Sequence, residues 1–275
     1  MSLKILKRVA RASHAQPIHF AIHFGLAMCR CGAHDSAMTD KKVAIITGAS
    51  RGIGAALVSA YAQAGYAVVA NARAIGPSTN PNVVAVAGDV GDPATAGRVV
   101  DEAVRRFGHL DSLVNGAGIY ISKPFTDYTQ TDYDALLSTN IAGFFHLTQR
   151  ALRVMEQQGW GHILTITATI AEQPVEGVPT VLASLTKGGL NAATKALAIE
   201  YATRGIRVNA VSPGVIDTSA APEPTPSAPG APAAVPRIGH VRDVVAAALY
   251  LESASFVTGE ISHVDGGRSA GCWNP

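Results

Sequence analysis

From Lys41 onward, short apolar runs alternate with longer segments of helical periodicity. The runs are four to six residues long and apolar on both sides, as strands buried on both faces of a sheet should be. The expected strands are Val43–Thr47, Ala67–Ala70, Val83–Ala87, Ser112–Asn115, His162–Thr167, Arg207–Val211 and Ile261–Val264. This alternation is typical of a parallel sheet wrapped by helices. The sequence therefore predicts an α/β fold, doubly wound around a central parallel sheet of about seven strands.

Helical patterns fill the intervals between these runs. They cover Gly54–Ala64, Pro93–Phe107, Thr131–Gln157, Leu185–Thr203 and Val241–Ser253. Only Pro222–Pro236 is low in complexity, and its six prolines exclude both a helix and a central strand. We expect a loop there. No other segment resembles a linker, so residues 38–275 are predicted to form a single domain.

Composition limits the class of protein. With 48% hydrophobic and 15% charged residues, the chain can bury a sizeable core and is not disordered as a whole. The net charge of +2 comes from residues 1–37, because the remainder holds 17 basic and 19 acidic residues. No basic stripe with interleaved aromatic residues is present, so we expect no nucleic-acid partner.

Residues 1–37 are the part of the chain that least resembles a folded domain. Their apolar stretch, Ile18–Met28, contains two histidines and is far shorter than the roughly 20 apolar residues of a membrane helix. The basic composition allows a transit peptide, but Met38 followed by Thr-Asp-Lys-Lys and a strand fits the start of a domain better. We therefore expect 1–37 to be a disordered extension or the product of a misplaced start codon.

The cysteines indicate the redox environment of the protein. Cys29, Cys31 and Cys272 form neither a disulfide framework nor a set of metal ligands. Reduced thiols in a cytoplasmic protein fit best, with no metal site and no membrane association.

A glycine-rich turn follows the first expected strand. Thr47–Gly54 reads Thr-Gly-Ala-Ser-Arg-Gly-Ile-Gly, and an apolar helix comes next. Gly48 permits a tight turn, while Gly52 and Gly54 let the helix N-terminus meet a pyrophosphate and pack on the strand. The free N–H groups of the helix then face the anion. This context predicts a dinucleotide site whose ligands are Gly48, Ser50, Arg51, Gly52, Ile53 and Gly54.

The second strand indicates which dinucleotide is bound. A site selective for NAD(H) usually offers an acid at the end of that strand, which bonds the ribose diol. Here Val68–Arg73 reads Val-Val-Ala-Asn-Ala-Arg and contains no acid. Arg73, together with Arg51 in the turn, suits the oxygens of a 2′-phosphate. NADP(H) is therefore expected in preference to NAD(H).

The spacing Gly-x-x-x-Gly-x-Gly resembles that of the short-chain dehydrogenase/reductase family, whose domain is of the Rossmann type. The resemblance covers about residues 41–267. It includes Asp89-Val90, Asn115-Gly116-Ala117-Gly118, the Asn140 segment Ser-Thr-Asn-Ile-Ala-Gly, Ser212–Thr218 and Val257–Gly259. By this resemblance, further cofactor contacts are expected at Asp89, Val90, Asn115, Ala117, Gly118, Lys187, Pro213, Gly214, Val215 and Thr218. It also implies that Asn140 holds a water in a proton relay.

The sequence departs from the family at the catalytic groups. The resemblance to this family implies a catalytic Ser–Tyr–Lys set, in which the Tyr and the Lys lie four residues apart on one helix. Lys187 matches the lysine, but Ala183 stands where the tyrosine belongs. The serine falls at Ala168 or Thr169, and Thr169 offers a similar hydroxyl. The expected catalytic residues are therefore Asn140, Thr169 and Lys187.

Three interpretations remain open. In the preferred one, the chain is an NADP(H)-dependent oxidoreductase that transfers hydride to a small carbonyl, imine or enone, with a proton from Lys187, from Ser184 or from water through Asn140. In the second, it binds NADP(H) without catalysis, as a sensor or partner subunit, and Lys187 persists as a ribose ligand. In the third, Glu172 or Glu176 acts as the acid, although solvated loop charges explain these two residues more simply.

Two further expectations rest on the resemblance. The helical patterns 131–157 and 185–203 resemble those that form the four-helix interfaces of family oligomers, which implies a homotetramer or a dimer. The proline-rich loop, residues 219–236, falls where the family carries its substrate lid.

Overall fold

A computed structural model describes residues 41–218 and 234–271. The expectations for residues 1–37, for the three cysteines and for most of the proline-rich loop lie outside these residues.

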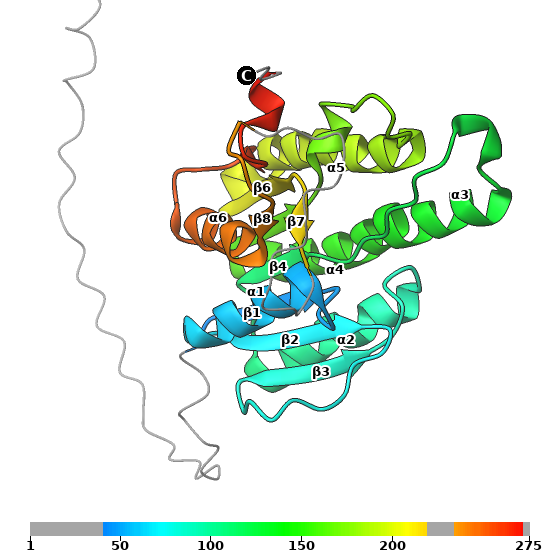
Figure 1. Ribbon diagram of the computed structural model, residues 1–275. Helices are drawn as coiled ribbons and strands as arrows, with labels where there is room; N and C mark the ends of the chain where they lie inside the picture. Colours follow the sequence, from blue (N-terminus) through cyan, green and yellow to red (C-terminus); the bar gives the residue numbers. More distant parts are fainter. Residues whose placement is uncertain (1–40, 219–233, 272–275) are drawn as a thin grey trace, which may run out of the picture. The chain divides into compact units, whose positions relative to one another are not determined.

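Seven parallel strands form the centre of the domain (Figure 1). They are β1 (Val43–Thr47), β2 (Ala67–Ala72), β3 (Val83–Ala87), β4 (Ser112–Asn115), β5 (Gly161–Ile166), β6 (Ile206–Pro213) and β9 (Ile261–Val264). Their order is β3-β2-β1-β4-β5-β6-β9. In this register Ile45 of β1 lies between Val69 of β2 and Leu113 of β4. The predicted doubly wound α/β fold is confirmed.

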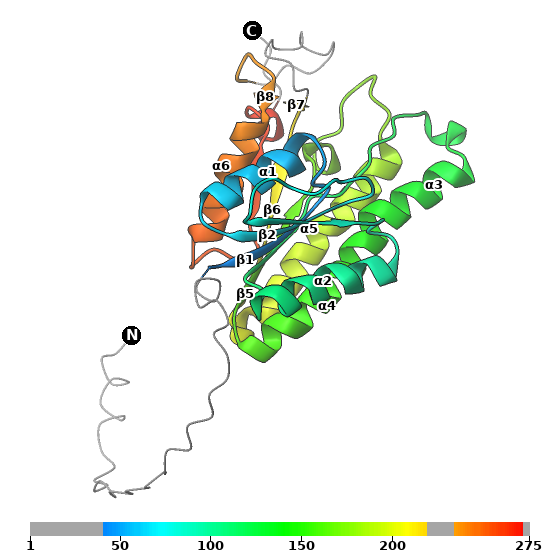
Figure 2. The ribbon, with the colours of Figure 1, turned by 90° about the horizontal axis from the view of Figure 1, so that it is seen from below.

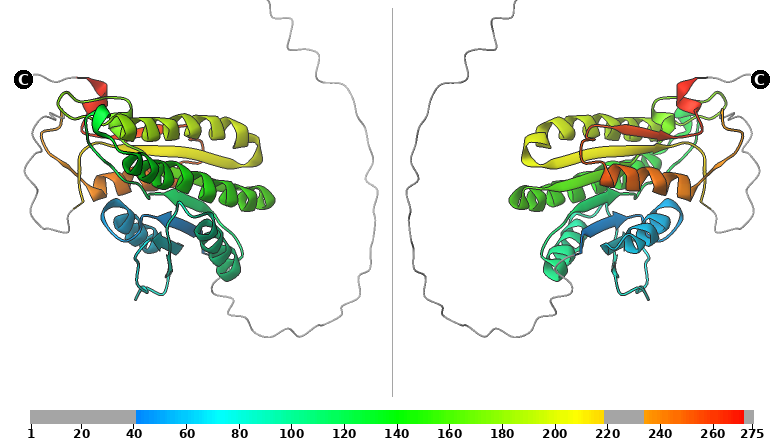
Figure 3. Two further views of the ribbon diagram at one scale, coloured as in Figure 1. Left: turned by 90° about the vertical axis from the view of Figure 1, so that its right-hand side faces the viewer. Right: turned by 90° about the vertical axis from the view of Figure 1, so that its left-hand side faces the viewer.

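Helices cover both faces of this sheet (Figure 2). One apolar core joins the sheet to α1 (Gly52–Gln63) and α6 (Val241–Ser253). The other joins it to α2 (Pro93–Phe107), α4 (Gly143–Gln158) and α5 (Val181–Tyr201). Figure 3 shows α4 and α5 on the same face of the sheet. Because every central strand has apolar residues on both sides, each face needs its own layer of helices.

Local signals explain where α2 begins and ends. Asp92 caps its N-terminus by accepting hydrogen bonds from the N–H groups of Ala94 and Thr95. Pro93 occupies the first helical position, where a missing N–H costs nothing. At the other end, Gly108 adopts the left-handed conformation with φ of 83°. The sequence pattern therefore predicted this helix with its observed bounds.

The helix expected over Thr131–Gln157 is present, but it is not a regular α-helix throughout. The structure has α3 (Gln130–Leu136), a π-helical turn over Leu137–Ala142, and then α4. Thr129 and Asp132 form a capping box that starts α3. The wider turn coincides with Asn140, whose side chain bonds the backbone of Ile119 instead of facing solvent. Periodicity alone does not reveal a π-helical turn, because the apolar pattern continues through it.

Smaller differences concern helix starts and a short strand pair. Helix α1 begins at Gly52, and α5 begins at Val181, so Ala183 lies inside the helix. The pair β7 (Ile216–Asp217) and β8 (Gly239–His240) was not expected. Two-residue strands carry no recognisable pattern in sequence. None of the described helices is long and apolar enough to cross a membrane.

Candidate active site and cofactor cleft

The chain reverses its direction across the sheet between β1 and β4. From β1 it continues to β2 and β3 on one side, and from β4 to β5, β6 and β9 on the other. A crevice forms outside the carboxyl ends of the strands at such a point. Thr47, the buried last residue of β1, holds it in shape, because its Oγ1 accepts hydrogen bonds from the N–H groups of Gly116 (3.1 Å) and Ala117 (3.0 Å).

The glycine turn lies at this crevice and leaves no room for side chains. Gly48 has φ of 69°, and a Cβ there would lie 2.8 Å from Gly116 O. A Cβ on Gly54 would lie 2.1 Å from Gly48 O. Arg51 precedes α1 without capping it through its side chain. The first N–H groups of α1 therefore have no side-chain acceptor, which is the arrangement that binds a pyrophosphate.

An open cleft of about 840 Å³ runs over the turn and the strand ends. This volume lies within the usual range for small-molecule sites. The cleft is lined by twelve of the predicted cofactor residues, namely Gly48, Ser50, Arg51, Gly52, Ile53, Gly54, Arg73, Asp89, Val90, Ala117, Gly118 and Thr218. Sequence reasoning missed Asn71, Ala72, Ala74, Gly88, Gly116, Ile119 and Thr139, which also line it. Their position just after parallel strands is the signal that would have found most of them.

The end of β2 carries amide and guanidinium groups rather than an acid. Asn71 donates from Nδ2 to Val86 O (2.9 Å) and Gly88 O (3.2 Å), which fixes the ends of β2 and β3 together. Its Oδ1 is buried and has no hydrogen-bond partner among the described residues. Arg51 and Arg73 are both exposed in the same cleft. The cleft thus offers a cradle for a pyrophosphate and cationic groups for further anionic oxygens, which fits a nicotinamide dinucleotide.

Five predicted cofactor residues do not line the cleft. Asn115 is buried and donates to Thr148 Oγ1 (3.0 Å). Gly214 packs against Asp265, so that a Cβ on it would lie 2.8 Å from Asp265 Cα. Pro213, Val215 and Lys187 complete this group, and their contacts to a cofactor stay predictions.

Lys187 lies just behind the wall of the cleft. Its Nζ donates to Ile166 O at the end of β5 (2.8 Å). A Cβ on Gly118, which lines the cleft, would lie 3.0 Å from Lys187 Nζ and 3.4 Å from Asn140 Oδ1. Glycine at position 118 therefore leaves the ammonium and the amide close to the cleft. Burial lowers the pKa of Lys187 to about 8.

The side chain of Asn140 joins three parts of the site. Its Oδ1 accepts from Ile119 N (2.9 Å), and its Nδ2 donates to Ile119 O (3.1 Å) and to Thr186 Oγ1 (3.1 Å). Asn140 thereby fixes the loop after β4 and helix α5 to the π-helical turn. This is a positioning role, and the water that the family resemblance implies at this asparagine stays a prediction.

Thr169 lies in a different environment from Lys187. It is buried, and its hydroxyl donates to Ser212 O and lies within 3.3 Å of Asp265 Oδ2. Glu172 likewise has partners, because it accepts from Asn191 Nδ2 (2.7 Å) and pairs with His263 Nε2 (2.8 Å). The structure therefore brings Asn140, Lys187 and Gly118 together, and commits the hydroxyl of Thr169 elsewhere.

Comparison with known proteins identifies this arrangement. A family model described as enoyl-(acyl carrier protein) reductase matches residues 48–269, which include the glycine turn, Asn140 and Lys187. The chain belongs to the short-chain dehydrogenase/reductase family.

Members of this family that resemble the chain are oxidoreductases. The 3-oxoacyl-[acyl-carrier-protein] reductase FabG of Escherichia coli (strain K12) is 33% identical over 237 residues, which cover 82% of this chain and 96% of FabG. The crystal structure of a 3-ketoacyl-(acyl-carrier-protein) reductase from Brucella melitensis complexed with NADH has a TM-score of 0.74 at 30% identity, covering 83% of this chain and 98% of that one.

A further solved structure that resembles the chain has the phosphorylated cofactor bound. ElxO, as a variant with tyrosine replaced by phenylalanine and with NADPH bound, has a TM-score of 0.73 at 28% identity, covering 84% of this chain and 100% of that one. Together with the cleft, these neighbours support a nicotinamide dinucleotide as the cofactor.

Proposed function

We propose that this protein is an NADP(H)-dependent oxidoreductase that reduces a small carbonyl compound, or a related imine or enone, with a proton donor other than tyrosine. The observation that carries the proposal is the cluster of Lys187 Nζ, Asn140 Oδ1 and Gly118 beside the dinucleotide cleft. Lys187 is half-buried, and enclosing part of a charged side chain beside the cleft costs folding free energy. Its presence there is best explained by chemistry or by cofactor binding.

Preference for NADP(H) rests on charge. Arg51 lies in the glycine turn and Arg73 follows β2, and both line the cleft. Guanidinium groups match phosphate oxygens in a bidentate way, and no acid ends β2 to favour an unmodified ribose. We infer that the two arginines bind the 2′-phosphate.

The chain's own residues would divide the work as follows. The α1 N-terminus and the glycine turn bind the pyrophosphate, while Thr47 holds the turn after β4 in place. Asn140 keeps the loop at Ile119 and helix α5 in register. The bound nicotinamide supplies hydride to the substrate. Losing a positioned general acid costs about 10²–10⁴-fold in rate, so the absence of tyrosine at Ala183 slows such a reaction without abolishing it.

A cofactor-binding protein without catalysis is the second candidate. It is favoured by Ala183, a buried alanine where the family tyrosine belongs, and by the commitment of the Thr169 hydroxyl to Ser212 O. In that case Lys187 would serve only as a ribose ligand. The two candidates share every cofactor residue and differ in turnover.

Titration of the full-length protein with NADPH and NADH, followed by fluorescence, tests the cofactor assignment. The same samples are then assayed for NADPH oxidation with acetoacetyl-coenzyme A, 9,10-phenanthrenequinone, a cyclic imine and a cyclic enone. Tighter binding of NADPH with oxidation in at least one assay supports the reductase. Tight binding without oxidation, together with activity gained by Ala183→Tyr, supports the second candidate.

Assembly is proposed from exposed apolar side chains on one face. Val181, Leu185 and Ile199 of α5 lie on one stripe of the helix and are exposed, as is Phe145 of α4. We propose that these helices form the interface of a homotetramer or dimer. A cytoplasmic location is proposed from the few, unpatterned cysteines.

A further inference from the structure

The missing tyrosine leaves the reduction without an obvious source for its proton. Four hydroxyl-bearing residues lie in or near the segment that normally supplies it: Thr169, Thr180, Ser184 and Thr186. Thr169 donates to Ser212 O, and Thr186 donates to Ala183 O (3.0 Å). Ser184 donates to Ile170 O (2.9 Å) and contacts Thr180 Oγ1 (3.3 Å). The protons of Thr169, Ser184 and Thr186 are thus committed to backbone carbonyl groups, and the hydroxyl of Thr180 is engaged with Ser184 Oγ.

Acidic residues offer no better source. Glu172 accepts from Asn191 and pairs with His263, so it joins the loop after β5 to α5 and β9. Its carboxylate oxygens are therefore both engaged with neighbouring side chains. Asp265 likewise accepts from the N–H groups of Gly267 (2.9 Å) and Ser269 (2.8 Å), and these bonds lower its pKa even though burial would raise it.

Lys187 differs from all of these groups. An ammonium has three protons to donate, and within the described residues one acceptor, Ile166 O, is bonded to it. The space next to Nζ belongs to Gly118, which lines the cleft and has no side chain to block it. Two protons of Nζ therefore have no acceptor among the described residues, and Gly118 lies between Nζ and the cleft.

We propose that the ammonium group of Lys187 is the proton donor of the reduction, in place of the phenol that Ala183 lacks. This inference rests on the proposed function. The carbonyl carbon gains a hydride, which is one proton and two electrons, from the reduced nicotinamide. The oxygen forms an O–H bond as an Nζ–H bond of Lys187 breaks. The product is an alcohol, Lys187 is left as a neutral amine, and solvent returns a proton to it before the next turnover.

The surroundings of Nζ suit this role. Burial lowers the pKa of Lys187 to about 8, so near neutral pH the ammonium form predominates but releases its proton more readily than an ordinary lysine. The groups packed around Nζ are Ile166 O from β5, Gly118 from the loop after β4 and the Asn140 amide from the π-helical turn. None of them titrates, and among the described residues no charged neighbour contributes to the shift.

The test compares the wild-type protein with Lys187→Arg, Lys187→Met and Lys187→Ala. Single-turnover rates are measured at saturating NADPH from pH 6 to 10, with whichever of the four probe substrates the wild type reduces. The wild-type rate is expected to fall as pH rises through about 8, because the ammonium is consumed. Arginine keeps the charge but does not release a proton in this pH range. The rate of Lys187→Arg should therefore be about 10²–10⁴-fold lower than that of the wild type and show no step near pH 8.

Two readouts separate proton donation from cofactor binding. First, methylamine and ethylamine should restore part of the lost rate in Lys187→Ala, because each supplies an ammonium proton to the space that the lysine side chain leaves. Second, the ¹⁵Nζ signal of Lys187, assigned by its absence in Lys187→Arg, should titrate near pH 8 in the complex with NADP⁺. The Kd for NADPH and the thermal melting curve are recorded for each variant, so that a folding or binding defect is recognised.

Tyr120→Phe is the matched control. Tyr120 is 54% exposed and directly follows Ile119, a residue that lines the cleft. It therefore carries a phenol next to the cleft without being a proposed proton donor. Its replacement should leave both the rate and the pH step unchanged.

Several outcomes would overturn the inference while leaving the proposed function intact. These are a pH step that survives in Lys187→Met, a loss of NADPH affinity with no change in the saturated rate, or loss of the step in Tyr120→Phe. Failure of the wild-type protein to bind NADPH, or binding without oxidation by any probe, contradicts the proposed function itself and the inference with it.

Discussion

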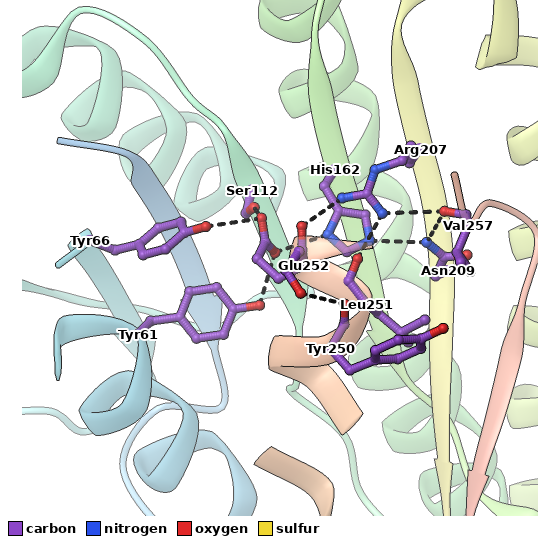
Figure 4. A network of polar contacts seen from close by, with 11 residues as sticks. Tyr61, Tyr66, Ser112, His162, Arg207, Asn209, Tyr250, Leu251, Glu252 and Val257 are labelled. Atoms are coloured by element: carbon purple, nitrogen blue, oxygen red, sulfur yellow. Dashed lines mark hydrogen bonds and ion pairs between the residues drawn. The ribbon is translucent and has the colours of Figure 1, made fainter. Parts of the chain in front are cut away.

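The Nδ1 atom of His162 lies 2.9 Å from Oε2 of Glu252, inside the domain and at the end of the sheet opposite to the cleft (Figure 4). Glu252 also accepts hydrogen bonds from the hydroxyl groups of Tyr61 (3.0 Å), Tyr66 (3.3 Å) and Ser112 (2.5 Å). Nε2 of His162 contacts Asn209 Nδ2 (3.2 Å), which fits a neutral ring protonated at Nδ1. One carboxylate therefore connects α6 to α1, β4 and β5.

Acidification should destabilise the protein through this pair. Burial lowers the pKa of His162, so the unfolded chain takes up its proton first and stability falls below about pH 6.5. Burial alone would raise the pKa of Glu252, but the bonds from His162, Ser112 and Tyr61 outweigh it and lower the pKa to about 2. Its stabilising effect is present above about pH 4.3 and is lost as the pH falls toward 2.

Glu252→Gln should cost about 3 kcal/mol in the free energy of unfolding at pH 7, because the hydroxyl donors and His162 lose a buried anionic acceptor. Urea denaturation measured between pH 4 and 8 checks this. The variant should also lose less stability than the wild type between pH 5 and 4. Glu200→Gln, at an exposed position of α5, is the control and should be neutral. Equal effects of the two substitutions would contradict the role given to the pair.

Thr47→Val should lower stability by about 2 kcal/mol, since the N–H groups of Gly116 and Ala117 both lose their acceptor while the shape of the side chain is kept. NADPH affinity should fall with it, because the turn after β4 forms one wall of the cleft. Thr194→Val offers a matched comparison: Thr194 is also buried, but its hydroxyl bonds only Leu190 O within its own helix. Its effect should stay below about 1 kcal/mol.

Arg51→Ala and Arg73→Ala should each weaken NADPH binding about 10–100-fold and leave NADH binding nearly unchanged. The reason is that each removes a charged donor for the 2′-phosphate, which NADH lacks. Fluorescence titrations with both dinucleotides measure the difference. Arg242→Ala, at an exposed position of α6, should affect neither cofactor. If both arginine variants lose affinity for NADPH and NADH to the same extent, the arginines contact the shared pyrophosphate instead.

Ile199→Glu should lower the oligomeric state of the protein. The side chain of Ile199 is 82% exposed on α5, and a charge there would be buried unpaired in a helix–helix interface. Sedimentation velocity at micromolar concentration should show a tetramer or dimer for the wild type and a smaller species for the variant. A wild-type monomer would refute the proposed assembly.

Much of the fold followed from the sequence because strand and helix patterns are local. Val43–Thr47 and Pro93–Phe107 were predicted with their observed bounds, the first from its apolar run and the second from its helical pattern. The glycine turn was predicted for the same reason, since its conformational demands lie within a few residues. By contrast, His162 and Glu252 are 90 residues apart and nothing in either segment points to the other.

The site was predicted less completely. Family resemblance named Asn140 and Lys187, which both lie close to Gly118, and their catalytic roles stay predictions. The resemblance did not reveal that Thr169 bonds Ser212 and Asp265. Rotamer and hydrogen-bond choices of this kind depend on tertiary neighbours. The π-helical turn at Asn140 was missed for the same reason.

The two walls of the cleft come from segments about 70 residues apart, joined by the hydroxyl of Thr47. An incomplete chain that ends before β4 lacks one wall, so dinucleotide affinity arises only once β1 and β4 have paired. The dinucleotide therefore binds only the folded chain. In excess it should stabilise the folded state by RT ln(1 + [L]/Kd). The cellular concentration of the nicotinamide dinucleotide would then influence how much of this protein survives proteolysis, in addition to its rate of turnover.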